Sequence, residues 1–95
     1  SKAGVIMLTK CIALEYAPSI RANAILPGLV RTPMIEQRFT EAEDPAALEE
    51  AYASLYPLHK MGKVEDMANA AAFLSSDESG FITGEIMQVC GGSLI

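Results

Sequence analysis

The sequence predicts an α/β fold built around an open parallel sheet, and two observations support that prediction. Residues 20–26, apolar apart from Arg21 and Asn23, have the pattern of a strand buried on both faces, and residues 85–90 (EIMQVC) are expected to form a second strand; a glycine turn follows each segment. A run of helix formers, residues 65–74, lies between them. Strand, helix and strand at this spacing favour parallel neighbours joined by a right-handed crossover. The expected order is therefore helix, strand, two lid helices, helix, strand.

The first predicted helix covers residues 1–17, a stretch of strong helix formers that ends at Pro18. Proline ends it because its ring nitrogen has no hydrogen to donate and because it disfavours helical geometry in the preceding residue. The polar side chains of this stretch do not share one face, so a helix buried on several sides is expected.

The first strand stops abruptly at Pro27-Gly28, and this turn is the expected ligand site. Open α/β sheets bind small molecules beyond the carboxyl ends of their strands, and a glycine lets backbone approach a bound molecule without a Cβ in the way. Thr32 followed by Pro33 predicts a helix N-cap. A hydroxyl and free backbone N–H groups at a helix start also suit a phosphate or a carboxamide, although a purely capping role for Thr32 fits the same residues.

Residues 33–58 form an acidic segment that we interpret as a lid of two short helices over the site. Asp44-Pro45 is a second cap-and-proline helix start, and apolar side chains from Leu48 to Tyr56 share one face of the helix that follows. The residues expected to face the substrate are Met34, Ile35, Tyr52, Leu55 and Tyr56. A solvated amphipathic decoration with no gating role is the alternative.

Composition limits the possible partners. A chain of 95 residues that is 51% hydrophobic has more apolar surface than it can bury alone, so it is expected to pack against other protein. A net charge of −5 without a basic cluster disfavours nucleic acid and anionic membranes. No apolar segment approaches the roughly 20 residues of a membrane span, and no signal-peptide pattern is present, so a cytoplasmic protein is expected.

The sequence offers little for metal or disulfide chemistry. Cys11 and Cys90 lie in apolar stretches without a CxxC spacing, which predicts two buried, reduced thiols. His59 is the single histidine, so no metal site is expected, and its place beside Lys60 in a loop predicts a surface histidine.

Several short motifs occur together in one register: S-K-A-G at residues 1–4, N-A-I-L-P-G at 23–28 with Thr32 four residues after the glycine, E-D at 65–66, and I-T-G at 82–84. Together they resemble the C-terminal half of the short-chain dehydrogenase/reductase family. The resemblance implies a doubly wound, Rossmann-type parallel sheet, with residues 1–95 as the C-terminal portion of one NAD(P)-binding domain. It also implies an oxidoreductase that moves hydride between NAD or NADP and a small carbonyl or secondary alcohol substrate.

The resemblance assigns roles to five positions. Lys2 matches the lysine of the family's Tyr-x-x-x-Lys motif, which binds the nicotinamide ribose and tunes the catalytic tyrosine. Pro27 and Gly28 match the turn beside the nicotinamide, Val30 the residue whose backbone meets the carboxamide, and Thr32 the hydroxyl that contacts the cofactor. The tyrosine and the glycine-rich pyrophosphate motif do not occur in these 95 residues, so the chain by itself is expected to be inactive.

A second hypothesis treats the chain as a non-catalytic assembly or dimerisation module derived from such an enzyme. Both hypotheses expect homo-oligomer contacts through helices 1–17 and 65–74 and strand 85–90. The acidic lid disfavours anionic substrates through like-charge repulsion.

Overall fold

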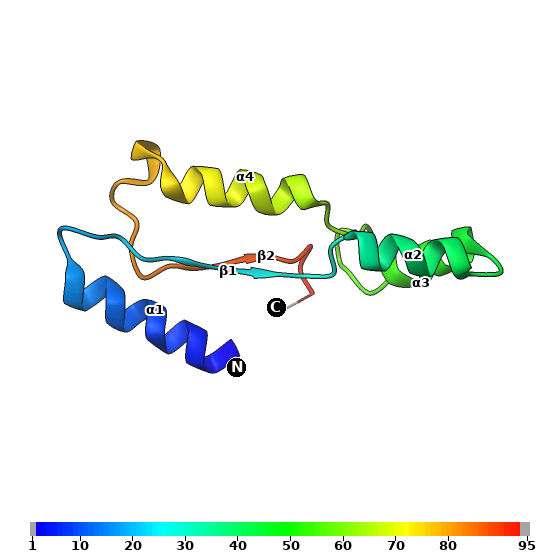
Figure 1. Cartoon of the computed structure of the whole chain (residues 1–95), viewed down its shortest axis with the longest axis horizontal. Coiled ribbons are helices and arrows are strands. Elements are labelled where there is room, and N and C mark those ends of the chain that lie inside the picture. Colours follow the sequence, from blue (N-terminus) through cyan, green and yellow to red (C-terminus); the bar gives the residue numbers. More distant parts are fainter. Residues whose placement is uncertain (1, 94–95) are drawn as a thin grey trace.

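The computed structural model describes residues 2–93 as an α/β unit with the predicted order of elements (Figure 1). Its elements are α1 (Lys2–Tyr16), β1 (Ala24–Pro27), α2 (Pro33–Glu41), α3 (Pro45–Ala53), α4 (Val64–Ser75), a 3-10 turn η1 (Asp77–Ser79) and β2 (Ile86–Val89).

The two strands form a parallel pair, as predicted. Ala24 pairs with Ile86 at one end and Pro27 with Val89 at the other. The first strand is shorter than predicted, because side chains interrupt the backbone ladder before Ala24: the Ala22 carbonyl still accepts the Gly84 N–H at 2.7 Å, but the Ala22 N–H donates to Thr83 Oγ1 at 3.1 Å. Asn23 accepts the Glu85 N–H at 2.9 Å through Oδ1 and donates to the Ile82 carbonyl at 3.3 Å through Nδ2. Asn23 thus fixes the register at the amino ends of the strands.

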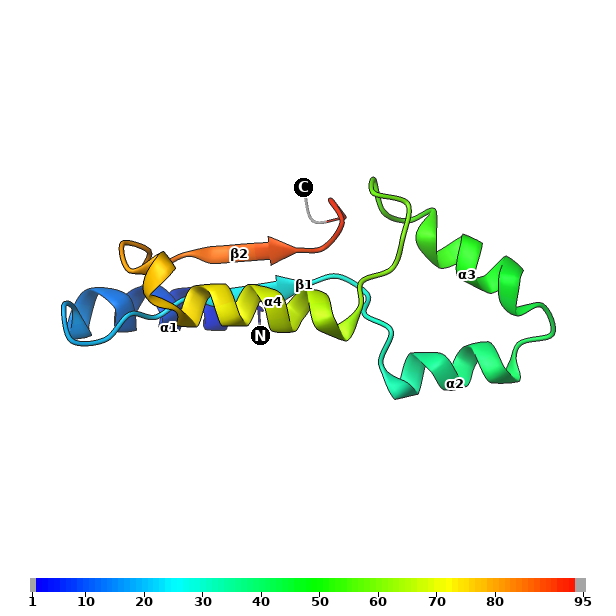
Figure 2. The ribbon, with the colours of Figure 1, turned by 90° about the horizontal axis from the view of Figure 1, so that it is seen from above.

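Helices α1 and α4 cover opposite faces of the two strands (Figure 1). Figure 2 gives the sense of the connection: with α4 in front of the sheet and both strands pointing right, the chain passes upward from β1 to β2. A right-handed crossover would pass downward, so the predicted handedness is wrong. The physical reason is that α1 already covers one face of the two strands. A right-handed path between the same two strands would have placed α4 on that face.

Arg21 fastens the end of the sheet away from the Pro27-Gly28 turn. Its guanidinium donates to the carbonyls of Leu74 at 3.0 Å, Ser76 at 3.2 Å and Ile82 at 3.0 Å. Carbonyls in the last turn of a helix have no partner within that helix, so Arg21 supplies one at the end of α4. The lead into β1 is thereby tied to the far end of α4.

The predicted caps are present. Thr32 Oγ1 accepts the Ile35 N–H at 3.4 Å, and Asp44 Oδ1 accepts the Ala47 N–H at 3.2 Å. Helix α3 ends at Ala53, however, so the predicted helical face that reached Tyr56 is shorter than expected. The last part of that face lies in irregular chain.

Helix α1 buries a single stripe, formed by Thr9 and Ala13. Five of its apolar residues are at least half exposed: Val5, Met7, Leu8, Leu14 and Tyr16. Cys11 is exposed as well, while Cys90 is buried. The expectations of a helix covered on several sides and of a buried Cys11 are therefore wrong for this chain, because α1 meets only the sheet. Within residues 2–93, no helix has both the length and the apolar character needed to cross a bilayer.

Helices α2 and α3 form an arm that extends beyond the carboxyl ends of the strands (Figures 1 and 2). The molecule is accordingly elongated, with principal extents of 53 × 25 × 23 Å. The arm has a small core of its own, in which Ile35, Phe39 and Met61 are buried. Phe39 meets Tyr52 of α3 edge to face, with the ring centroids 5.9 Å apart.

Candidate functional site

The predicted site residues gather at one end of the sheet. Both strands point toward the arm, and the turn after β1 lies between sheet and arm (Figure 1). The N-terminal end of α1, where Lys2 lies, is also at this end, because α1 runs opposite to β1 (Figures 1 and 2). Lys2 is exposed there. The topology thus brings the lysine and the turn to the edge where open sheets bind ligands.

Gly28 packs tightly against the end of β2. Its N–H donates to the Val89 carbonyl at 3.1 Å. A Cβ at this position would lie 3.1 Å from Cys90 Cα, 3.2 Å from Cys90 O and 3.2 Å from Tyr56 Cε1. The sequence predicts the glycine for the approach of a ligand, but in the structure its missing side chain makes room for the chain's own backbone and for Tyr56.

Tyr56 is bonded to the turn through its hydroxyl. Its hydroxyl accepts the Leu29 N–H at 2.7 Å, and the residue is 9% exposed. The sequence identifies Tyr56 only as part of an apolar lid face. Its hydrogen bond connects residues 27 positions apart, and no local pattern in the sequence signals such a pair.

Val30 pairs with Gly62 in an isolated parallel bridge. The Gly62 N–H donates to the Leu29 carbonyl at 3.0 Å, and the Arg31 N–H donates to the Gly62 carbonyl at 2.9 Å. In this pattern the N–H and C=O of Val30 itself face away from Gly62. The Val30 carbonyl accepts the Thr32 N–H at 2.8 Å, whereas the Val30 N–H has no acceptor within residues 2–93. The turn therefore presents one backbone donor for a further partner.

Thr32 stands two residues further along, at the start of α2. Its Oγ1 uses one lone pair for the Ile35 cap, so the hydroxyl keeps its own hydrogen and a second lone pair for another group. The N–H groups in the first turn of a helix also add a partial positive charge at this point. Val30 and Thr32 together offer two hydrogen-bond donors and an acceptor within one turn.

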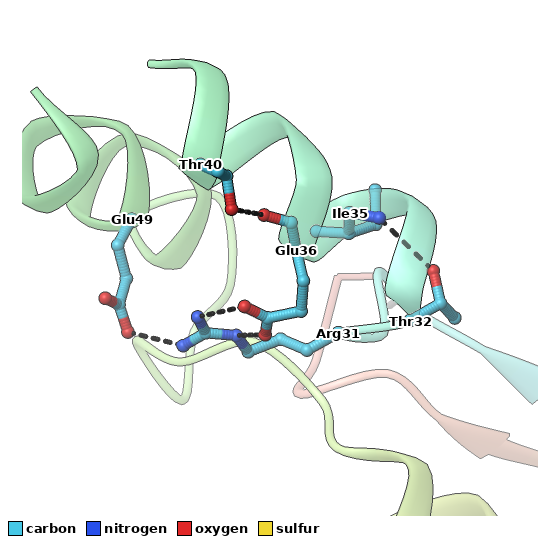
Figure 3. Close-up of polar contacts among 6 residues, drawn as sticks. All are labelled: Arg31, Thr32, Ile35, Glu36, Thr40 and Glu49. Atoms are coloured by element: carbon cyan, nitrogen blue, oxygen red, sulfur yellow. Dashed lines mark hydrogen bonds and ion pairs between the residues drawn. The ribbon is translucent and has the colours of Figure 1, made fainter. Parts of the chain in front are cut away.

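Arg31 lies between them and joins the turn to both helices of the arm, α2 and α3 (Figure 3). Its Nε and Nη2 bond the Glu36 carboxylate of α2 at 2.6 and 3.2 Å, and its Nη1 bonds Glu49 of α3 at 2.9 Å. The guanidinium also stands over the Phe39 ring, 4.6 Å from the centroid. The hydrogen bond with Glu36 and the charges of both glutamates raise the pKa of Arg31. No local pattern in the sequence signals this network, because its members are 5 and 18 positions apart.

A cavity of about 250 Å³ opens beside the turn. Its lining combines the turn, the chain between α3 and α4, the start of α4 and the end of β2, and includes Gly28, Leu29, Tyr56, Met61, Met67 and Cys90. Lys2, Pro27, Val30 and Thr32 are not among the residues that line it. Of the predicted site residues, the cavity therefore brings together Gly28 and Tyr56.

The other predicted lid residues lie apart from this cavity. Ile35 is buried in the core of the arm, and Tyr52 packs against that core. Met34 and Leu55 are 69% and 66% exposed. His59 is at the surface, as predicted, and its Nε2 lies 2.8 Å from a Glu50 carboxylate oxygen.

Comparisons with known proteins identify a family and relatives for this chain. A family model described as enoyl-(acyl carrier protein) reductase matches residues 1–93. The 3beta-hydroxysteroid dehydrogenase 1 of Eggerthella lenta is 48% identical over 93 residues, which make up 97% of this chain and 34% of that protein.

Solved structures show the same fold. A C-terminal deletion mutant of the aldohexose dehydrogenase from Thermoplasma acidophilum has a TM-score of 0.89 at 36% identity, covering 98% of this chain and 43% of the other. ElxO with NADP bound has a TM-score of 0.88 at 34% identity, covering 98% and 37%. The chain thus spans between about a third and just over two fifths of these proteins. From the family match over residues 1–93 and the shared Rossmann-type arrangement, we conclude that the chain belongs to the short-chain dehydrogenase/reductase family of oxidoreductases.

Proposed function

We propose that this chain forms the nicotinamide side of an NAD(P)-dependent oxidoreductase that acts in the cytoplasm on a carbonyl or secondary alcohol. The observation that carries the proposal is the pair of donors at the turn after β1: the Val30 N–H, without an acceptor in residues 2–93, and the Thr32 hydroxyl. A carboxamide has an acceptor oxygen and a donor NH₂ group, so this turn fits the amide of nicotinamide.

When bound, a nicotinamide cofactor supplies or accepts the hydride. Val30 and Thr32 would orient its ring through the carboxamide, and Lys2 would bind the ribose hydroxyls. A lysine four residues after a tyrosine shares its helix face, and its positive charge favours the phenolate form of that tyrosine. In the proposed enzyme the tyrosine lies in an upstream half of the domain and acts as general acid and base.

The arm supports a preference for uncharged substrates. Residues 33–58 carry six carboxylates and only Arg38 as a cation. Arg31 pairs with two of those carboxylates, at Glu36 and Glu49, and the other four keep a negative field around the lid. Like-charge repulsion then disfavours anionic substrates and acidic carrier proteins.

The proposal is tested by changing Lys2 in a protein that carries the family's upstream half. Lys2→Ala is expected to lower kcat/KM by about 100-fold or more, the usual contribution of a group that supports acid–base catalysis. Lys10→Ala is the matched control, because Lys10 lies on the same helix and makes one exposed contact, 3.4 Å from the Gly84 carbonyl. Turnover by Lys2→Ala at the rate of the unchanged protein would contradict the role of Lys2.

An assembly module is the second candidate function, and the exposed apolar residues of α1 favour it. Sedimentation with and without NAD(H) or NADP(H), on the protein with its upstream half, separates the two. Saturable cofactor binding supports the oxidoreductase, while tight oligomers that bind no cofactor support the module.

A further inference from the structure

The turn after β1 is held in shape by contacts with distant parts of the chain. The Gly28 N–H bonds the Val89 carbonyl at 3.1 Å, and the Leu29 carbonyl accepts the Gly62 N–H at 3.0 Å. Both contacts join backbone to backbone. The hydrogen bond of 2.7 Å from the Leu29 N–H to the Tyr56 hydroxyl is different, because a side chain supplies the acceptor. The shape of the turn therefore depends in part on one phenol group.

This phenol acts next to the donor that is proposed for the carboxamide. Leu29 lies between two planar peptide units, of which the first carries its own N–H and the second carries its carbonyl and the Val30 N–H. The Tyr56 hydroxyl holds the first unit, and the Gly62 N–H holds the second. Because both units are held, the two backbone dihedral angles of Leu29 are set, and with them the direction of the Val30 N–H. Loss of the hydroxyl would release the first unit.

Tyr56 is itself firmly placed. Its side chain is buried, its N–H donates to the Ala53 carbonyl at 3.1 Å, and its carbonyl accepts the His59 N–H at 2.8 Å. Gly91 packs against it so closely that a Cβ on Gly91 would lie 3.4 Å from Tyr56 Cβ. The Gly91 carbonyl also accepts the Leu58 N–H at 3.0 Å. The chain after β2 thus fixes the base of the side chain whose hydroxyl holds the turn after β1.

We infer that Tyr56 is a positioning residue for the nicotinamide end of the cofactor, acting through Leu29 on the direction of the Val30 N–H. The inference rests on the proposed function, because it requires a nicotinamide at this turn. It gives Tyr56 a role other than the one expected from the sequence, which places it in the lid facing the substrate. Its hydroxyl is engaged by the backbone of the turn, so its loss is expected to weaken the binding of nicotinamide and to leave the binding of substrate unchanged.

Tyr56→Phe tests the inference in the protein with its upstream half, because it removes the hydroxyl and keeps the ring. Calorimetric titration gives the dissociation constants of NADH and of ADP-ribose, which lacks the nicotinamide, or of NADPH and 2′-phospho-ADP-ribose. In Tyr56→Phe the dinucleotide is expected to bind about fivefold more weakly, the change that one typical hydrogen bond contributes. The affinity for the ligand without nicotinamide is expected to stay the same.

The ratio of the two dissociation constants separates positioning from stability. If Tyr56→Phe only lowered the fraction of folded protein, both ligands would bind more weakly by the same factor, and the ratio would not change. Tyr16→Phe is the matched control. It removes the same hydroxyl from a half-exposed residue at the end of α1 that lies away from the turn, so both constants are expected to stay the same (Figure 1).

Failure of the inference and failure of the proposed function give different results. If the unchanged protein binds the dinucleotide and Tyr56→Phe leaves the ratio of the two constants unchanged, the positioning role is wrong and the oxidoreductase stands. A rise in the substrate KM of Tyr56→Phe with an unchanged ratio would return Tyr56 to the lid role. If the unchanged protein binds neither NADH nor NADPH, the oxidoreductase is wrong and the positioning role falls with it.

Discussion

The hydroxyl of Tyr56 holds the turn after β1 through a single hydrogen bond of 2.7 Å to the Leu29 N–H. Tyr56→Phe would leave that amide without its acceptor while preserving the packing of the ring against Gly28. We expect a loss of about 1–3 kcal/mol in the free energy of unfolding, the usual cost of a polar group left unsatisfied. Urea denaturation measures it.

Tyr52→Phe provides the control for this prediction. The Tyr52 hydroxyl makes one exposed contact of 3.5 Å with Arg38, so its removal is expected to change the free energy of unfolding by less than about 0.5 kcal/mol. Equal losses in the two variants would show that the hydroxyl of Tyr56 does not support the turn.

Single residues were predicted best where their role is local. Thr32 and Asp44 cap helices as expected, because a capping side chain bonds an amide three residues away. The position of Gly28 was expected, but its packing partner was not, because Cys90 is distant in sequence. The role of Arg31 has no local signal either, because no periodic pattern in the sequence joins it to Glu49.

At the scale of the elements, α3 depends on its cap. Asp44→Ala removes the Oδ1 acceptor of the Ala47 N–H and is expected to destabilise α3 by about 1 kcal/mol, the typical cost of losing an N-cap. Amide exchange of residues 45–53 should therefore become faster, while that of α4 stays the same. Asp44→Asn keeps a good capping side chain and should behave like the unchanged chain. Faster exchange in both helices after Asp44→Ala would indicate a global effect and contradict a local cap.

The elements were predicted in type and order, and their ends less well. Side-chain hydrogen bonds from Asn23 replace ladder pairing before Ala24, so the apolar run of residues 20–26 overstates the strand. In the same way, the apolar pattern from Leu48 to Tyr56 predicts a longer α3 than the structure has. Hydrophobic periodicity continues past Ala53, but the chain turns there so that Tyr56 reaches Leu29.

At the scale of the whole molecule, the exposed face of α1 predicts association. Leu8 and Leu14 are 61% and 85% exposed on a helix that the sheet covers on one side only. Exposed apolar groups of this kind mark contact surfaces. We expect the 95-residue chain to self-associate and the double change Leu8→Gln with Leu14→Gln to shift it toward monomer in sedimentation velocity.

Phe81→Gln is the control, because Phe81 is fully exposed but lies in the turn after η1, away from α1. It removes an apolar side chain as well, and it is expected to leave the sedimentation coefficient unchanged. A shift of equal size in this variant would mean that association follows general hydrophobicity and not the α1 face.

The global arrangement was the hardest to predict. Parallel pairing followed from strand, helix and strand, but the side on which α4 lies depends on α1, which no rule about a single crossover includes. The exposure of Cys11 has the same origin, since its burial depends on what covers the outer face of α1.

The bridge between Val30 and Gly62 has a consequence for how such enzymes diversify. The arm leaves the sheet at one of these residues and returns at the other, and hydrogen bonds of 2.9 and 3.0 Å hold the two stems together. Because these hydrogen bonds fix both ends of the arm, its length can vary at a small cost in loop-closure entropy without displacing the sheet. Grafting an arm of another length between these stems should therefore leave the parallel strands and the turn after β1 unchanged.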